Sequence, residues 1–222
     1  MYNVIMDCDP GHDDAIALLL ASRADNIRLL GVTTVAGNSY IENVTRNARK
    51  VLDYAGVTDV DVYAGADKPM MHELYRLTGA IIHGEDGLGG PKLPDPVTPV
   101  PAEHAVSFII RTLRASAEKV VLIPTGPLTN IAMALMQAPD IKEKIDRIII
   151  MGGAIYDPGN VTSAAEFNIY QDPEAARIVI QSGCNIYLNT LDVSMKAVFY
   201  KEDKERIRAL GGKIPTLVAE LL

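Results

Sequence analysis

Short apolar runs alternate with amphipathic segments along most of the chain. The runs rich in β-branched residues predict strands, and the segments between them carry helix signals, such as proline in a first turn or glycine after a last one. The predicted strands cover residues 2–8, 28–35, 60–63, 119–124, 147–151 and 185–191. The predicted helices cover residues 13–24, 41–55, 103–117, 127–137, 173–182 and 214–222. This alternation predicts an α/β fold: an open, mostly parallel, Rossmann-like sheet with helices on both faces.

Two of the predicted strands and one connection stand out from this pattern. The strands at 119–124 and 147–151 are so apolar that we expect both of their faces to be buried. The connection at residues 65–101 is long and rich in proline and glycine. A connection of this length is usually functional or mobile, so it is either a lid or a surface excursion over a sheet edge. We expect residues 1–222 to form a single domain that contains it.

Composition and charge exclude several classes of protein. Of the 222 residues, 48% are hydrophobic, which excludes disorder, and the net charge of −7 argues against a nucleic-acid partner. The longest clean apolar run, at residues 15–21, is too short to cross a bilayer, so we expect no membrane partner. Two cysteines, Cys8 and Cys184, cannot build a disulfide framework. They favour a reducing compartment, and we expect a cytoplasmic protein.

The candidate chemistry lies at the junction of the first strand and the first helix. Asp7, Asp9, Asp13 and Asp14 fall within eight residues there. Open parallel sheets bind ligands at the carboxyl ends of their strands, so the position is that of a site. Asp9 is expected in the turn, whereas Asp13 and Asp14 are expected in the first helical turn. These two should point about 100° apart and serve different purposes.

Helix capping alone does not explain four acids at one turn. One aspartate could cap the helix and another could interact with the helix dipole. The remaining carboxylates would still repel one another and raise one another's pKa. A bound cation removes this repulsion, and ligands that are all oxygen favour Ca²⁺ or Mg²⁺.

The acidic cluster and several later motifs resemble the inosine–uridine-preferring nucleoside hydrolase family. The matching segments are residues 7–15, 35–38, 83–90, 124–130, 151–154, 166–168 and 172–176. They follow the family's order and extend over nearly the whole chain. The resemblance implies Ca²⁺-dependent hydrolysis of the N-glycosidic bond of a ribonucleoside, by a metal-activated water, to ribose and free base. It also implies a homo-oligomer.

The resemblance also assigns roles to individual residues. It implies that the side chains of Asp9 and Asp14 and the backbone carbonyl of Thr125 bind Ca²⁺, with Asp9 as the catalytic base. The residues that it places around the substrate are Asp13 and Asn168 at the 2′-hydroxyl, Asn38 beside the metal-facing side of the sugar, Asn160 and Glu166 at the 5′-hydroxyl, Met151 against the sugar and His83 toward the base. Independently of the family, Glu166 and Asn168 would share one face if their segment were extended.

The sequence departs from the family pattern in one respect. Family members carry a His-Asp pair beyond a further helical stretch, and no such pair occurs before Leu222. We therefore expect the chain to lack the C-terminal part of the family fold. A non-catalytic chain that binds a nucleoside or ribose is one alternative. Another is a Mg²⁺ phosphohydrolase of the haloacid-dehalogenase type, although that family expects Thr or Val where Gly11 stands. Preference for purine or pyrimidine bases stays open.

Overall fold

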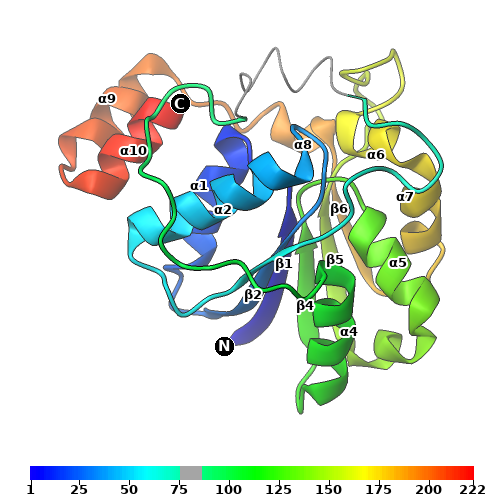
Figure 1. Ribbon diagram of the computed structural model, residues 1–222. Coiled ribbons are helices and arrows are strands. Elements are labelled where there is room, and N and C mark those ends of the chain that lie inside the picture. Colours follow the sequence, from blue (N-terminus) through cyan, green and yellow to red (C-terminus); the bar gives the residue numbers. More distant parts are fainter. Residues whose placement is uncertain (76–86) are drawn as a thin grey trace.

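The predicted strands assemble into one parallel sheet in the computed structural model, which describes residues 1–75 and 87–222 (Figure 1). The strands are β1 (Tyr2–Cys8), β2 (Ile27–Thr34), β3 (Val62–Ala64), β4 (Val120–Pro124), β5 (Ile145–Met151) and β6 (Ile186–Asn189). Their order is β3-β2-β1-β4-β5-β6, and each neighbouring pair is parallel. This is the Rossmann order, so the predicted fold class is confirmed.

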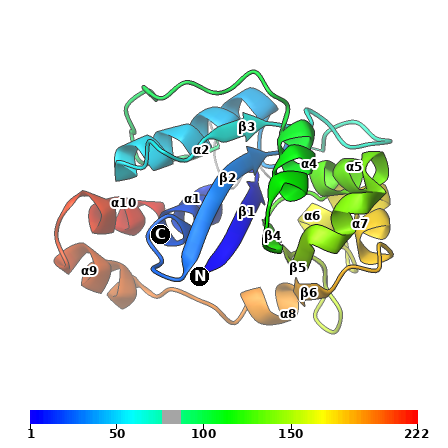
Figure 2. The same cartoon turned by 90° about the horizontal axis from the view of Figure 1, so that it is seen from below.

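Helices cover both faces of the sheet (Figure 2). They are α1 (His12–Ala21), α2 (Ile41–Ala55), α4 (Ala105–Ala115), α5 (Thr129–Gln137), the 3₁₀ helix η1 (Pro139–Lys144), α6 (Phe167–Gln171), α7 (Pro173–Ile180), α8 (Leu191–Ser194), α9 (Lys201–Ala209) and α10 (Lys213–Leu221). The chain steps outward from β1 to β3 in one direction and from β4 to β6 in the other. Right-handed crossovers therefore place α1 and α2 on one face and α4, α5 and α7 on the opposite face.

The core consists of two apolar clusters, one on each face of the sheet. Side chains alternate along a strand, so Ile5 packs toward α4 and α5 while its neighbour Met6 packs toward α1 and α2. Both side chains are at most 2% exposed. The alternation leaves no room for a one-residue slip of β1, because such a slip would turn every core side chain to the wrong face.

The expected burial of β4 and β5 on both faces is correct for one face and only partly correct for the other, where Val121 is buried. Ile148 and Ile150 are fully buried under the helices that follow β4 and β5, whereas Ile123 and Ile149 on the opposite face are only half-buried. Those two line a hollow of about 230 Å³. Among the described residues, the helices of that face lie over β1 and β2 and do not extend across β5 (Figure 2).

Two composition-based expectations can be compared with the structure. Both Cys8 and Cys184 are free thiols, and Cys8 lies in the core. Within residues 1–75 and 87–222, none of the helices combines the length and the apolar character needed to cross a bilayer.

The topology also fixes where a ligand can bind. β1 and β4 lie side by side at the centre of the sheet, and the chain leaves them toward opposite faces. Such a switch point opens a crevice at the carboxyl ends of the two strands. The turn after β1 begins with Asp9, and the turn after β4 begins with Thr125. The predicted metal ligands therefore lie at the switch point.

Candidate active site

Asp9 and Asp14 form a buried pair of acids at the start of α1. Asp9 is 1% exposed and Asp14 is 4% exposed. The backbone N–H of Asp9 donates a hydrogen bond of 3.0 Å to Oδ2 of Asp14. Asp13 is exposed, so the two neighbouring acids have different environments, as the helical geometry predicts.

The carboxylate of Asp9 is held by the loop that follows β2. The backbone N–H of Asn38 donates to Oδ2 of Asp9 at 2.7 Å, and the side-chain amide of Asn38 donates to the backbone carbonyl of Asp9 at 3.0 Å. Asn38 therefore lies beside the acid pair, and its contact with the sugar stays a prediction.

Two glycines leave the space that this carboxylate occupies. A Cβ added to Gly37 would overlap Oδ2 of Asp9, and a Cβ added to Gly126 would lie 2.6 Å from Oδ1. Both distances are shorter than real Cβ contacts. The loops after β2 and β4 can therefore close around Asp9 only because these two positions lack a side chain.

Thr125 and Asn168 complete the group around the acids. The side-chain hydroxyl of Thr125 donates a hydrogen bond of 3.5 Å to the backbone carbonyl of Asp7, and it lowers the pKa of Asp14. The backbone carbonyl of Thr125 accepts a hydrogen bond of 2.8 Å from Nδ2 of Asn168, which also donates to the carbonyl of Met151 at 3.1 Å. The sulfur of Met151 lies 3.4 Å from the same amide nitrogen. Residues from the ends of β1, β4 and β5 therefore meet at one place.

Burial makes this acid pair electrostatically costly. It raises the pKa of Asp9 well above its usual range, and the negative charge of Asp14 raises it further, against the opposing effect of the Asn38 N–H. Burial also raises the pKa of Asp14, and the charge of Asp13 adds to that rise. Two buried carboxylates this close cannot both ionise cheaply without a positive charge beside them.

The donor set fits a hard divalent cation. Asp9 and Asp14 lie beside the turn that carries Thr125, so two carboxylates and one backbone carbonyl are available at the switch point, and calcium and magnesium prefer such oxygen ligands. Throughout the part of the chain that the structure describes, no group of three or more His, Cys, Asp or Glu side chains could hold a metal ion. An ion here would therefore depend on the backbone carbonyl as well as on the two acids.

Glu166 and Asn168 lie at the start of a helix and not in a continuous extended segment. Glu166 is the N-cap of α6, and its carboxylate accepts hydrogen bonds from the backbone N–H groups of Asn168, Ile169 and Gly153 at 2.8 to 3.3 Å. Burial raises the pKa of Glu166 above its usual value, and these backbone hydrogen bonds offset only part of the rise. The extended geometry fails because this carboxylate stabilises the first turn of a helix.

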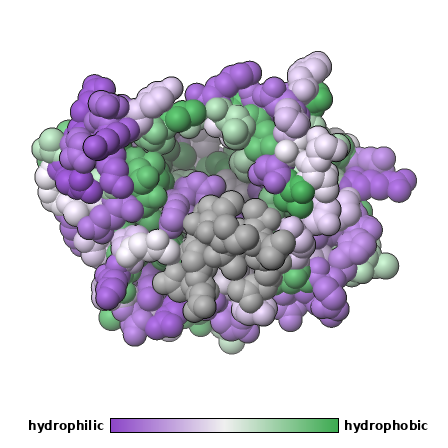
Figure 3. All heavy atoms as spheres, turned by 90° about the horizontal axis from the view of Figure 1, so that it is seen from above, coloured by the Kyte–Doolittle hydropathy of each residue, from purple (hydrophilic) through white to green (hydrophobic). Residues whose placement is uncertain are grey.

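The two remaining predicted substrate contacts have different outcomes. Asn160 is exposed, and its Oδ1 accepts a hydrogen bond of 2.9 Å from the backbone N–H of Phe167. It therefore fixes the loop before α6 from outside the acid cluster. His83 lies outside the described residues. Figure 3 looks onto the edge of the molecule at the carboxyl ends of the strands, where the surface is hollowed near its centre.

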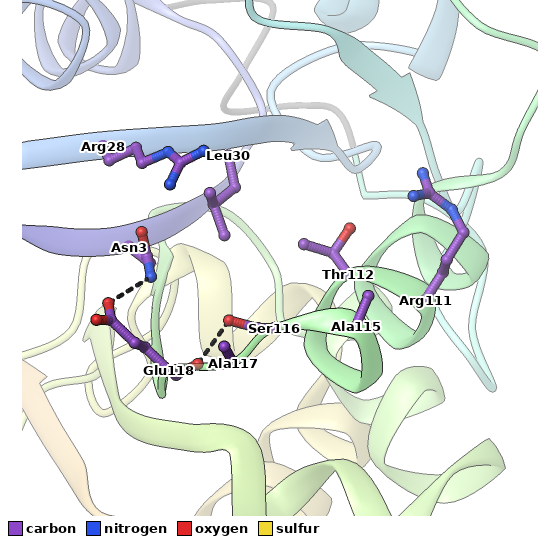
Figure 4. Close-up of a pocket in the computed structure, with 9 residues that line it drawn as sticks. All are labelled: Asn3, Arg28, Leu30, Arg111, Thr112, Ala115, Ser116, Ala117 and Glu118. Carbon is purple, nitrogen blue, oxygen red and sulfur yellow. Dashed lines mark hydrogen bonds between the residues drawn. The ribbon is translucent and has the colours of Figure 1, made fainter.

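A further hollow, of about 490 Å³, lies at the edge of the sheet where the strands begin (Figure 4). It adjoins the start of β1 and β2 and the end of α4, and Asn3 there donates to Glu118. Because it lies at the amino ends of the strands, it is far from the crevice of the switch point.

Sequence reasoning missed three residues that build the site. Gly37 and Gly126 belong to recognised motifs, but their contact with Asp9 depends on loops that only the fold brings together. Asn130 is fully buried in α5, whose other inward-facing side chains are largely apolar. Its place at the end of the matching segment 124–130, and an amide in an otherwise apolar helix, are the signals in the sequence that could have identified it.

Comparison with known proteins settles the family. The model for "Inosine-uridine preferring nucleoside hydrolase" matches residues 4–222. The chain belongs to this family. It is therefore a hydrolase of N-glycosyl bonds in ribonucleosides, and the phosphohydrolase alternative is not retained.

Individual relatives agree with this assignment. The chain is 48% identical over 219 residues to the pyrimidine-specific ribonucleoside hydrolase RihA of Escherichia coli O139:H28, covering 99% of this chain and 70% of the relative. The solved structure of a purine-preferring ribonucleoside hydrolase from Gardnerella vaginalis matches with a TM-score of 0.94 and 36% identity, over 99% of this chain and 70% of that one. A plant nucleoside hydrolase, PpNRh1, matches with a TM-score of 0.91 and 32% identity, over 99% and 69%.

Proposed function

We propose that this nucleoside hydrolase depends on Ca²⁺ held by the side chains of Asp9 and Asp14 and by the backbone carbonyl of Thr125. The observation that carries the proposal is the burial of Asp9 against Asp14 in the switch-point crevice. Burial raises the pKa of both acids, and the charge of Asp14 raises that of Asp9 further. A divalent ion is the simplest partner that lets both ionise. When bound, such an ion would make a neighbouring water molecule more acidic.

Asp9 is the proposed general base. The N–H of Asn38 already binds Oδ2, so we assign proton uptake from the attacking water to Oδ1. The crevice keeps this carboxylate at 1% exposure, which limits competition from bulk water. General bases of this kind contribute about 10²- to 10⁴-fold to a rate.

Asn168 is the proposed anchor for the ribose 2′-hydroxyl. Its Nδ2 is committed to the carbonyls of Thr125 and Met151, which fixes the amide plane and assigns Oδ1 to accept from a hydroxyl. Asp13 is proposed to bind the 2′-hydroxyl as well, and Asn38 is proposed to lie beside the metal-facing side of the sugar. Met151 is proposed to pack against the sugar. A fixed amide binds a hydroxyl strongly and rejects analogues that lack it.

The other two proposed sugar contacts act at the 5′ end. Glu166 and Asn160 both organise α6 and the loop before it, and we propose that they also bind the 5′-hydroxyl. His83 is proposed to face the base. Because RihA, at 48% identity, is named as pyrimidine-specific, we propose uridine and cytidine as the preferred substrates.

Calcium binding and base release test this proposal together. Asp9→Asn and Asp14→Asn should each abolish calcium binding in titration calorimetry, and Asp9→Asn should lower kcat on uridine by about 10²- to 10⁴-fold. Asp25→Asn, which changes an exposed acid outside the crevice, should change neither quantity. If both site variants keep the calcium affinity of the wild type, the assigned ligand set is wrong. Uridine should release its base faster than inosine.

A further inference from the structure

Asn130 is a buried polar side chain to which neither the fold class nor the reaction assigns a task. It is fully buried in the first turn of α5, which follows the Thr125 turn. Burying an amide is unfavourable unless its donors and acceptor are all paired. The position therefore calls for an explanation in terms of what the amide contacts.

The amide of Asn130 joins three strand ends to one helix. Its Nδ2 donates to Oδ1 of Asp7 at 2.8 Å and to the backbone carbonyl of Thr34 at 2.9 Å. Its Oδ1 accepts from the backbone N–H of Ala66 at 2.9 Å. Asp7 lies in β1, Thr34 ends β2, and Ala66 follows β3. A single side chain therefore connects α5 to the carboxyl ends of β1, β2 and β3.

The surroundings are shaped to accept this amide. A Cβ added to Gly65 would overlap both polar atoms of the Asn130 side chain and the carbonyl of Thr34. The hydroxyl of Thr33 donates to the same oxygen of Asp7 at 2.6 Å, so Asp7 is held from two sides. Asp7 and Thr33 are fully buried.

Short connections lead from this network to the proposed ligands. The carbonyl of Asp7 accepts a hydrogen bond of 2.8 Å from the backbone N–H of Thr125. The carbonyl of Ala66 accepts one of 2.9 Å from the N–H of Ala36, two residues before Asn38, and Asn38 in turn holds Asp9. The loops that carry Asp9, Asn38 and Thr125 all begin at strand ends that the Asn130 network joins directly or through one further hydrogen bond.

We propose that Asn130 is a positioning residue, which fixes the separation of the turns after β1, β2 and β4 and thereby the geometry of the proposed calcium site. This inference rests on the proposed function. It predicts that the loss of Asn130 changes the site more than it changes the rest of the fold, because the apolar clusters that stabilise the sheet do not depend on the amide.

The test compares Asn130→Ala with Ile131→Ala. Ile131 is the next residue of α5, is 1% exposed and lies in the apolar cluster, so its truncation destabilises the fold without altering the amide network. Calcium affinity of the folded protein is measured by titration calorimetry. We expect Asn130→Ala to weaken it at least tenfold, and Ile131→Ala to leave it within twofold of the wild type.

A second readout needs neither calcium nor substrate. The backbone N–H of Asn38 is protected by Oδ2 of Asp9, so its hydrogen exchange in the metal-free protein reports the placement of that loop. Asn130→Ala should accelerate the exchange of the Asn38 amide at least tenfold relative to the exchange of core amides. Ile131→Ala should accelerate the exchange of Asn38 and of the core amides by the same factor.

A charge-preserving exchange keeps the inference testable if Asn130→Ala fails to fold. Asp7→Asn combined with Asn130→Asp restores a hydrogen bond between the two side chains but not the one to the Thr34 carbonyl. We expect this double variant to bind calcium more tightly and to protect Asn38 better than Asn130→Asp alone. The inference is overturned if Asn130→Ala matches Ile131→Ala in both readouts, or if the double variant is no better than Asn130→Asp in both. If the wild type binds no calcium, the proposed function fails, while the exchange of Asn38 still decides the role of Asn130.

Discussion

The position of the Asp9 carboxylate, the proposed catalytic group, is fixed by close packing as well as by hydrogen bonds. One oxygen is fixed by the Asn38 N–H, and both oxygens lie against glycines from two different loops. The side chain of an acid in a polar, solvated turn can adopt several rotamers. Here the surrounding backbone leaves space for one position of the Asp9 carboxylate, so a single added methyl group should displace this carboxylate.

Replacing Gly126 by alanine tests this dependence. The new Cβ would lie 2.6 Å from Oδ1 of Asp9, so the carboxylate or the loop must move. We expect calcium affinity to fall at least tenfold and the free energy of unfolding to fall by about 1–3 kcal/mol, as for other overpacked cores. Calorimetry and urea unfolding measure the two quantities.

Gly183→Ala is the matched control. Gly183 has a φ of +83° and open space around it, so alanine there should lower stability by about 1–2 kcal/mol through backbone strain alone. Its calcium affinity should stay that of the wild type. Equal losses of affinity in the two variants would show that the contact with Asp9 is unimportant.

At the scale of elements, the sequence predicted what depends on local pattern. The strands and longer helices lie within a few residues of their predicted bounds, because each carries an apolar period of its own. α9 was not predicted because it buries none of its residues and so shows no apolar face. α6 was missed because it has five residues and is capped by Glu166, whereas Ser, Thr, Asp and Asn are the usual caps.

The contacts of the candidate site are likewise of two kinds: some are local in sequence and could be predicted, and others depend on the tertiary fold. Asp9 and Asp14 are five positions apart, so the turn and the first helical turn suffice to bring them together. The hydrogen bond between Asn130 and Asp7 joins residues 123 positions apart. No local pattern encodes such a pair, because only the tertiary fold brings the two residues together. The predicted contact of His83 with the base stays a prediction.

Asp53 of α2 binds the long connection at residues 65–101, and the pH dependence of stability tests this contact. Asp53 accepts hydrogen bonds from the backbone N–H groups of Val97 and Thr98 and from the Thr98 hydroxyl, and it lies 3.0 Å from the buried guanidinium of Arg49. Burial raises the pKa of Asp53, but these donors and the arginine outweigh it and hold the pKa below the usual 3.8. The ionised form therefore stabilises the folded state.

The sign of the effect follows from that lowered pKa. The stabilisation is fully present above the unfolded pKa near 3.8 and is lost as pH falls through the lower folded value. Asp53→Asn should be about 1–3 kcal/mol less stable than the wild type at pH 7, and the difference should shrink below pH 4. Urea unfolding across this range measures it. Asp59→Asn, at an exposed acid, should follow the wild type throughout; a constant deficit for Asp53→Asn would contradict the assignment.

At the scale of the whole molecule, apolar surface remains on one side of the described structure. Val193, Met195, Val198, Phe199 and Tyr200 are each more than half exposed between β6 and α9. Patches of this kind often mark contacts with another chain. The expected homo-oligomer stays a prediction, for which sedimentation at several protein concentrations is the direct measurement.

Calcium removal provides a test that involves the entire fold. Asp9 and Asp14 follow β1, and Thr125 follows β4, so an ion bound to all three would tie the two halves of the sheet together at their switch point. Any ligand that binds only the folded state stabilises it, by about 2.7 kcal/mol at a free concentration of 100 Kd. For a chain of this length we expect calcium to raise Tm by roughly 5–10 °C, and a chelator to reverse the rise. The shift should disappear in Asp14→Asn and persist in Asp59→Asn, because only the first loses a proposed ligand. A shift of equal size in both variants would mean that calcium binds elsewhere, and the ligand set proposed for the crevice would then be wrong.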